Sequence, residues 1–199
     1  MPNSTADPAM AGPASGGAAS GDRAVGWLMV GGGSVGLLAA LVLTVEKFLL
    51  LKDPSHRPSC SINPVLSCGS VMTKPQAEVF GFPNPLIGIV GFTVVVTLGV
   101  VVLAGVSLPR WMWRGLQVGA LAGVVFVHWL IFQSLYRIGA LCPYCMIVWA
   151  VTIPLFWYVV PHRLSPRLAR FHGVALTVWG LAIVGLILVR FWTYWVTLV

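Results

Sequence analysis

The chain has 199 residues, of which 58% are hydrophobic and only 9% are charged, and its mean hydropathy is +0.91. A soluble domain typically carries about 25% charged residues, so this composition excludes a water-soluble globular protein and indicates an integral membrane protein. The net charge of +7 comes from basic residues spread thinly between apolar runs. That pattern sets membrane topology and is not a nucleic-acid-binding surface.

Residues 1–23 are rich in Gly, Ala, Ser and Pro and contain almost no large apolar side chain. Such a segment cannot bury enough apolar surface to offset the entropy lost on ordering, so we expect a disordered tail. It lacks the basic start and apolar core of a secretory signal peptide.

Five apolar segments follow, and each is long enough to cross about 30 Å of hydrocarbon, which takes roughly 20 helical residues. They cover residues 24–51, 86–107, 116–135, 141–160 and 174–198. Arg190 interrupts the fifth segment and leaves its end open. We therefore predict an all-α membrane protein whose two termini lie on opposite sides of the membrane.

Arginines concentrate in two of the short connections. Segment 108–114 carries two arginines and segment 161–172 carries three, whereas the short connection before the fourth span has only Arg137. Short loops rich in Lys and Arg stay in the cytoplasm. The tail is therefore predicted inside and the 52–85 loop outside, which brings all four cysteines to the face where disulfides form and persist.

The four cysteines form two pairs with different spacing. Cys60 and Cys68 lie in "SCSINPVLSCGS", and Cys142 and Cys145 form the CPYC of "GALCPYCMIVWA", at the start of the fourth span. Three interpretations compete: structural disulfides that staple the outer loops, a four-thiolate zinc site, and two redox-active pairs. The wider pair alone is equally compatible with a staple.

The CPYC pair favours the redox interpretation. Closing so short a ring removes little chain entropy, so this pair is a poor staple. The wide spacing of the first pair and the oxidising face both disfavour a zinc site. Cys142 lies near a predicted helix start, with Pro143 in the first turn, where free N–H groups and the helix dipole stabilise a thiolate. Cys145 lies one turn deeper, and Trp149 follows on the same face, placed to stack on a flat ring.

Three stretches together resemble the bacterial form of the vitamin K epoxide reductase family: "CSINPVLSC", "CGSVMTKPQAEVFGFPNPLIG" and "QSLYRIGALCPYCMIVW". The resemblance covers residues 24–160, which would form the family's four-helix transmembrane catalytic bundle. The tail and residues 161–199, a cytoplasmic loop and a fifth transmembrane helix, lie outside it.

The resemblance implies a quinone-dependent thiol–disulfide oxidoreductase of the bacterial inner membrane, with no metal in its site. Cys142 and Cys145 would reduce a membrane quinone, menaquinone or ubiquinone, with Cys145 facing it. Cys60 and Cys68 would relay electrons to that pair from a separate exported thioredoxin-fold (DsbA-like) protein. The rival function is a non-catalytic membrane scaffold or transporter subunit stapled by disulfides.

The resemblance also implies that Asn84 hydrogen-bonds a quinone carbonyl, although Asn84 before Pro85 is equally an N-cap for the second span. Lys74 stands where many members have Ser or Thr. Trp149 stands where the human-type enzymes have a Tyr that contacts the quinone, which favours quinone reduction over epoxide reduction.

Two further features bear on the predicted site. The segment 70–80 places apolar residues among polar ones. This pattern predicts a short amphipathic helix that would lie over the pocket as a lid, although the periodicity fits a plain loop almost as well. His128 in the third span is interpreted as a neutral side chain bonded to a neighbouring helix, so it is left out of the predicted site, although a membrane histidine can also relay protons.

Overall fold

The computed structural model describes residues 16–164 and 171–197. The long helices are α1 (Gly16–Lys52), α3 (Pro85–Leu103), α4 (Arg110–Phe132), α5 (Pro143–Leu164) and α7 (His172–Arg190). The short ones are α2 (Cys68–Met72), the 3-10 turn η1 (Pro75–Ala77), the π-helix η2 (Gln133–Ile138) and α8 (Trp192–Val196). Five helices are long and apolar enough to cross a membrane, so the predicted all-α membrane fold is confirmed.

Several helix ends differ from the prediction. The first helix already begins at Gly16, so residues 16–23 are helical and the predicted tail is too long, while residues 1–15 lie outside the described residues. The third span begins at Arg110, directly after Pro109 in an extended conformation, because its first turn mixes Trp and Arg and is helical without being strongly apolar. The fifth ends at Arg190 and not at 198.

Small residues let α1 and α3 approach closely. A Cβ placed on Gly36 of α1 would lie 2.5 Å from the ring of Phe92 on α3, and one on Gly99 would lie 2.8 Å from the Cβ of Met29. Without such glycines the two backbones could not lie this near each other, which is how membrane helices commonly associate. Helix α5 packs against α1, α4 and α7.

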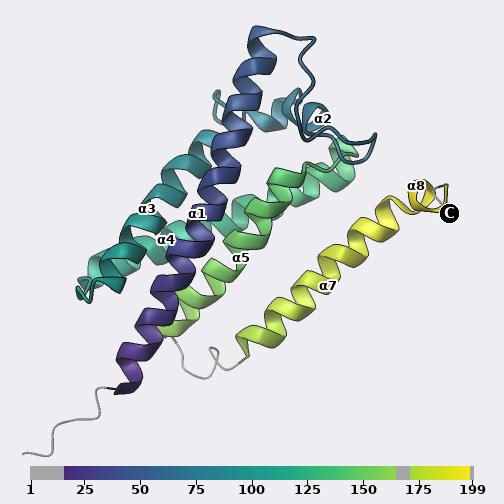
Figure 1. The fold of residues 1–199 in the computed structure, drawn as a ribbon. Helices are drawn as coiled ribbons and strands as arrows, with labels where there is room; N and C mark the ends of the chain where they lie inside the picture. The colour runs from purple at the N-terminus through teal and green to yellow at the C-terminus, as the bar shows by residue number, and fades with distance from the viewer. Residues whose placement is uncertain (1–15, 165–170, 198–199) are drawn as a thin grey trace, which may run out of the picture.

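The bundle carries its cysteines at one end. The end of α1, the short helix α2, the end of α4 and the start of α5 meet there, whereas the connection from α3 to α4, which contains Pro109, lies at the opposite end (Figure 1). Gly139, with φ of +71°, turns the chain out of η2 toward the start of α5. This left-handed conformation strains any residue with a Cβ.

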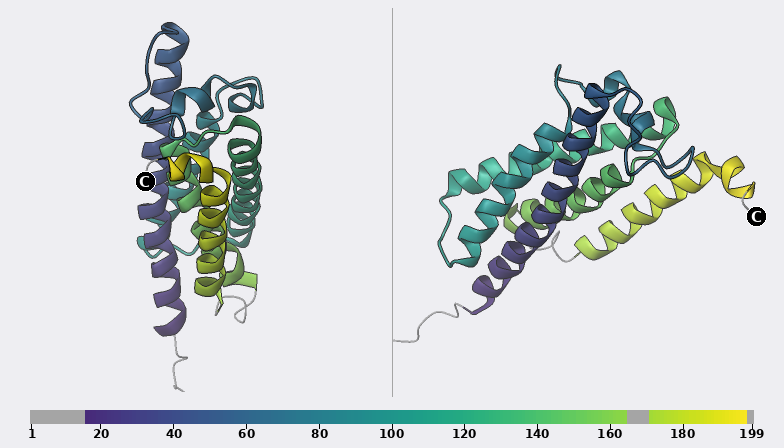
Figure 2. Two further views of the ribbon diagram at one scale, coloured as in Figure 1. Left: turned by 90° about the vertical axis from the view of Figure 1, so that its right-hand side faces the viewer. Right: turned by 45° about the horizontal axis from the view of Figure 1, so that its top comes forward.

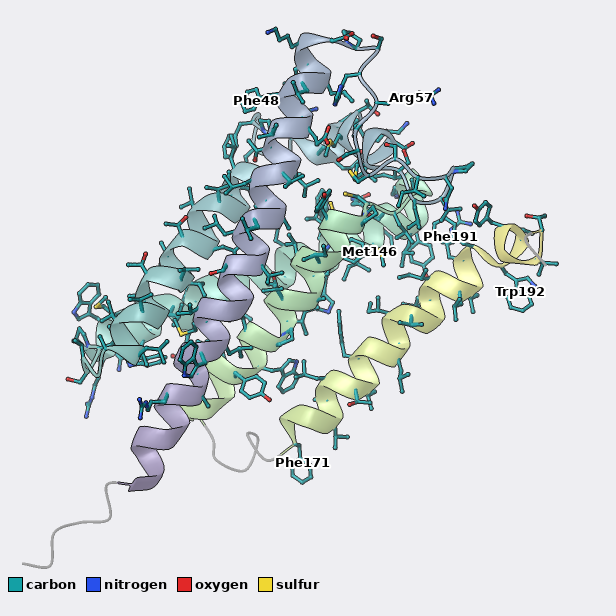
Figure 3. All side chains as sticks on the ribbon, in the orientation of Figure 1. Phe48, Arg57, Met146, Phe171, Phe191 and Trp192 are labelled. Carbon is teal, nitrogen blue, oxygen red and sulfur yellow. A yellow bond between two sulfur atoms is a disulfide. The ribbon has the colours of Figure 1, made fainter. Side chains whose placement is uncertain are left out.

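The fifth span runs along the α5 side of the bundle (Figures 1 and 2). Its lower part contacts α4, because the Trp179 indole N–H donates to His128 Nε2 at 2.9 Å. Its upper part contacts η2, because Arg190 Nε donates to the Leu135 carbonyl at 2.8 Å. Phe191 turns into the bundle and is 7% exposed, whereas Trp192 points away from it (Figure 3).

The interpretation of His128 as a neutral, bonded side chain is supported by both ring nitrogens. Nδ1 lies 2.7 Å from the Val124 carbonyl, which can only accept, and Nε2 faces an indole N–H, which can only donate. The ring therefore carries its single proton on Nδ1. It serves as a link between α4 and α7 and lies outside the site described next.

Candidate active site

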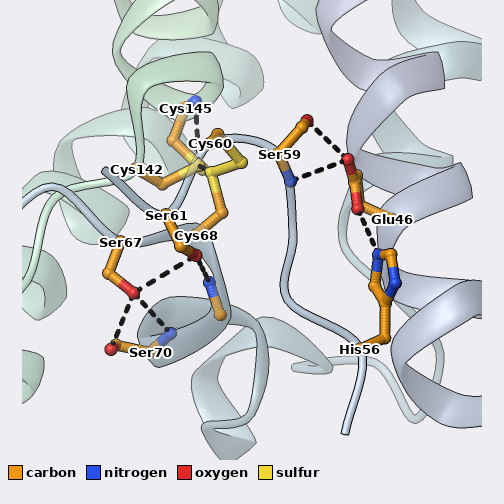
Figure 4. The surroundings of a disulfide bond; sticks show 11 residues. Glu46, His56, Ser59, Cys60, Ser61, Ser67, Cys68, Ser70, Cys142 and Cys145 are labelled. Carbon is orange, nitrogen blue, oxygen red and sulfur yellow. Dashed lines mark hydrogen bonds and ion pairs between the residues drawn. A yellow bond between two sulfur atoms is a disulfide. The ribbon is translucent and has the colours of Figure 1, made fainter. Parts of the chain in front are cut away.

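Cys60 and Cys68 are joined in a disulfide whose loop is tied to the end of α1 (Figure 4). Glu46 is only 8% exposed, and its carboxylate accepts from the backbone N–H and hydroxyl of Ser59 and lies 2.8 Å from His56 Nε2. Because Ser59 precedes Cys60 directly, these bonds hold one end of the disulfide in place.

The other end of the disulfide is held by the start of α2. Ser67 caps this helix by accepting from the Ser70 N–H at 3.3 Å, and Cys68 is its first residue. An isolated parallel bridge then holds the loop against the segment before α5: the Leu141 N–H donates to the Val65 carbonyl at 2.7 Å, and the Ser67 N–H donates to the Leu141 carbonyl at 2.8 Å. The residues that follow the two arms of this bridge are Cys68 and Cys142.

The bridge brings the two cysteine pairs into contact. The Sγ atoms of Cys68 and Cys142 lie 3.0 Å apart, and both residues are fully buried. The sulfurs of Cys60, Cys68 and Cys142 all lie within 4.8 Å of one another. Two of these three sulfurs are bonded to each other and are not thiolate ligands in this state. The arrangement suits thiol–disulfide exchange, in which a thiolate attacks one sulfur of a neighbouring disulfide.

Cys142 stands at the start of α5, immediately before the membrane-spanning part. Pro143 is the first helical residue, as predicted, and the Cys145 backbone N–H lies 3.5 Å from Cys142 Sγ. The Cys145 thiol, aided by the backbone N–H groups of Cys145 and Tyr144, lowers the pKa of Cys142 below that of an ordinary thiol, although burial opposes this. Cys142 is therefore the more readily ionised nucleophile of its pair.

A cavity of about 790 Å³ lies beside Cys145, and residues of α1, α3, α4 and α5 line it. This volume is within the roughly 300–1,000 Å³ typical of small-molecule sites. Most of its wall is apolar, and Cys145, Trp149 and Asn84 all line it, whereas Cys142 does not. The structure thus brings together all six residues that the sequence singled out, with Cys145 as the sulfur that faces the cavity.

Asn84 does not cap α3, because its side chain makes no capping bond. Instead its Oδ1 accepts from the Val79 N–H at 3.1 Å, and its Nδ2 donates to the Gln76 carbonyl at 2.7 Å. Each partner has only one role, so the network also fixes which atom is oxygen. Asn84 holds residues 76–79 over the cavity and retains a second N–H.

The predicted lid exists, but it is not one helix. Residues 70–80 break into the end of α2 and the turn η1, because Pro75 disfavours helical backbone at Lys74 and lacks an N–H for a continuing helix. Val71, Met72 and Phe80 nevertheless line the cavity from above. The segment 70–80, hereafter the lid, therefore covers the pocket as expected.

A buried lysine ties the lid to α1. Lys47 is 6% exposed, and its Nζ donates to the Met72 carbonyl at 2.7 Å and lies 2.8 Å from the Glu78 carboxylate. Lys47 was not identified from the sequence, although a lysine so near the end of an apolar span is a signal that could have indicated it.

The sequence model of the vitamin K epoxide reductase family matches residues 27–160 of this chain. The match covers α1 to α5 with the lid and both cysteine pairs, and ends before α7. No curated protein matches the chain significantly.

Proposed function

This chain belongs to the vitamin K epoxide reductase family, and on that premise we propose that it passes electrons from a reduced thioredoxin-fold partner through its two cysteine pairs to a membrane quinone. Membership makes it a thiol–disulfide oxidoreductase of the membrane, and members generally use quinones and thioredoxin-like partners. The observation that carries the proposal is the 3.0 Å contact between Cys68 and Cys142, which links an outer pair to a pair beside the cavity.

Electrons enter at Cys60 and Cys68, hereafter the outer pair, and are passed to Cys142 and Cys145, hereafter the inner pair. A thiolate of the partner attacks Cys60 and releases Cys68, and the partner's second thiol then completes its own disulfide, so the partner is oxidised and the outer pair is reduced. Two protons and two electrons thereby move from the partner's thiols to Cys60 and Cys68.

Exchange between the pairs uses the contact between them. The Cys68 thiolate attacks Cys142 of an oxidised inner pair and releases Cys145, and Cys60 then attacks Cys68 and releases Cys142. The result is a Cys60–Cys68 disulfide with Cys142 and Cys145 as thiols, which is the state of the structure. Two electrons then reside on a pair whose inner sulfur lines the cavity.

The cavity fits a quinone ring. Its wall is apolar, and Asn84 and Trp149 offer N–H groups that a ring carbonyl can accept from. A bound quinone takes up two electrons and two protons and becomes a quinol. The indole of Trp149 cannot act as the phenol of a tyrosine would, so we propose simple quinone reduction in support of disulfide formation, and not epoxide reduction.

We place the cysteine end on the outer face of a bacterial inner membrane. The support is the position of Arg110 and Arg114 at the opposite end of the bundle, because arginines in short loops stay in the cytoplasm. In intact cells in which Cys60 and Cys68 are reduced, a membrane-impermeant thiol reagent should label this pair whenever the loop opens, and more slowly than an exposed thiol, because both residues are buried. Labelling only after lysis would reverse this orientation.

The relay is tested by leaving one cysteine in each pair. In Cys60→Ala/Cys145→Ala, mild oxidation should join Cys68 to Cys142 rapidly and completely. Trypsin sites lie between these two cysteines, so the digested fragments should stay linked on a non-reducing gel and separate with reductant; the sites are Arg110, Arg114 and Arg137.

The matched variant is Cys68→Ala/Cys145→Ala, which leaves Cys60 and Cys142. It should link more slowly, because Cys68 and not Cys60 makes the 3.0 Å contact with Cys142 Sγ. Faster linkage through Cys60 would reverse the order within the outer pair. If neither variant links, and the unaltered protein passes no electrons from a dithiol to a quinone, the scaffold function is the better account.

A further inference from the structure

Three buried side-chain atoms have no hydrogen-bond partner within the described part of the chain: Gln76 Oε1, Gln133 Oε1 and Trp149 Nε1. All three residues line the same cavity as Cys145. A buried polar atom without a partner costs roughly 1–3 kcal/mol, so three of them around one cavity indicate that a polar ligand supplies the missing bonds.

The three atoms differ in what they can bind. The indole N–H of Trp149 can only donate a hydrogen bond, whereas the two amide oxygens can only accept one. A quinone ring has carbonyl oxygens that accept and nothing that donates. Its quinol has hydroxyl groups that both donate and accept. Trp149 can therefore serve both forms, but the two glutamine oxygens can be satisfied only by the reduced one.

Resting on the proposed function, we infer that Gln76 and Gln133 accept hydrogen bonds from the hydroxyls of the quinol, so that the site binds the reduced product more tightly than the oxidised substrate. When Cys142 and Cys145 form their disulfide, two electrons and two protons leave the pair and reach the two ring oxygens. Each new O–H then has an acceptor that the carbonyl form could not use.

The two glutamines reach the cavity from separately anchored segments. Gln133 is the first residue of η2, and the neighbouring Leu135 carbonyl is held by Arg190 of α7. Gln76 belongs to η1 in the lid, and its backbone carbonyl is held by Asn84. Because both backbones are fixed, a small rotation of either side chain would bring its amide oxygen to a ligand in the cavity without a large ordering cost.

Preference for the quinol has a thermodynamic consequence. Tighter binding of the reduced form raises the reduction potential of the bound quinone, by linkage. For a two-electron couple, a tenfold ratio of dissociation constants corresponds to about 30 mV. The two glutamines would thus make electron transfer from Cys142 and Cys145 to the quinone ring more favourable.

The test measures binding of both redox forms where no electrons can pass. In a Cys145→Ala background, Gln133→Met, Gln76→Met and the double variant are titrated with 2-methyl-1,4-naphthoquinone and with its quinol, following tryptophan fluorescence. Each Met keeps the length of the side chain and removes the acceptor. Loss of one net hydrogen bond should raise the quinol Kd about 2- to 12-fold and leave the quinone Kd nearly unchanged.

Two variants serve as controls. Trp149→Phe removes a donor that both forms use, so it should weaken both equally. Gln117→Met lies on α4 away from the cavity lining and should change neither. If the glutamine variants weaken the binding of both forms equally, or weaken neither, this inference is wrong but the proposed function still stands. If the background protein binds neither form, the quinone assignment in the proposed function fails with it.

Discussion

Replacing Asn84 with Ala should loosen the lid by a predictable amount. The change deletes two hydrogen bonds, one from the Val79 N–H and one to the Gln76 carbonyl. Each contributes roughly 0.5–1.5 kcal/mol net, so the closed lid should lose about 1–3 kcal/mol. At about 1.4 kcal/mol per tenfold, the open population rises about 5- to 140-fold. Helix α3 should be unaffected, because Asn84 makes no capping bond.

Hydrogen exchange measures this opening directly. The amide of Val79 should exchange faster by the same factor, because its protection depends on the lid remaining closed. Asn84→Asp keeps the acceptor for Val79 but places a carboxylate oxygen against the Gln76 carbonyl, so it should give at least as large an increase. Quinone reduction should slow as the lid admits water.

Thr93→Val provides a matched control on the same helix, because the Thr93 hydroxyl bonds only within α3, to the Ile89 carbonyl. It should leave lid exchange unchanged. If Asn84→Ala inserts and folds normally and the Val79 amide exchanges at the original rate, then Asn84 does not hold the lid and our account of its role is wrong.

Two further predictions concern the lysine under the lid and the ionisation of Cys142. Lys47→Met leaves the buried Met72 carbonyl without its donor, which should cost roughly 1–3 kcal/mol in thermal unfolding, whereas Glu78→Gln should cost at most about 1 kcal/mol because Glu78 is 38% exposed. Equal costs would show that the ion pair, and not the carbonyl, governs the contact. The thiolate absorbance of Cys142 should already be present at a pH below the range of an ordinary thiol, and it should vanish as the pH falls through the lowered pKa. In Cys145→Ala the titration should move to higher pH, because the Cys145 thiol is the main cause of the lowered pKa. An unshifted titration would refute that cause.

The sequence predicted the features that depend on local pattern. Hydropathy located five spanning helices, and the CPYC motif placed Cys142 at a helix start with Pro143 as the first helical residue. Both follow from short stretches of chain that carry their own signal. The lid was predicted in place but its form was not determined, because the pattern of residues 70–80 fits a helix and a loop almost equally well. In the structure the break at Pro75 divides it into two short helical turns.

The remaining features depend on contacts between distant segments, which single-sequence patterns do not report. Nothing in the sequence near Leu66 indicates that it pairs with Leu141, although this bridge positions the two cysteine pairs. The role of Asn84 was ambiguous for the same reason, because its partners in the lid follow from the tertiary fold. Gln76 became a candidate only when the cavity was defined, and Lys47 only when its contact with the lid was known.

The burial of the three neighbouring sulfurs determines which reductants can reach the protein. Cys60 is 5% exposed, and Cys68 and Cys142 are fully covered, so a small thiol in the surroundings has no open path to the disulfide. Exchange requires access to the attacked sulfur. The hydrogen bonds from Ser59 to Glu46 hold the residue beside Cys60 in place, so we expect access to require that these bonds break. A protein that docks on the loop and displaces that contact gains entry, whereas a freely diffusing thiol must wait for a spontaneous opening.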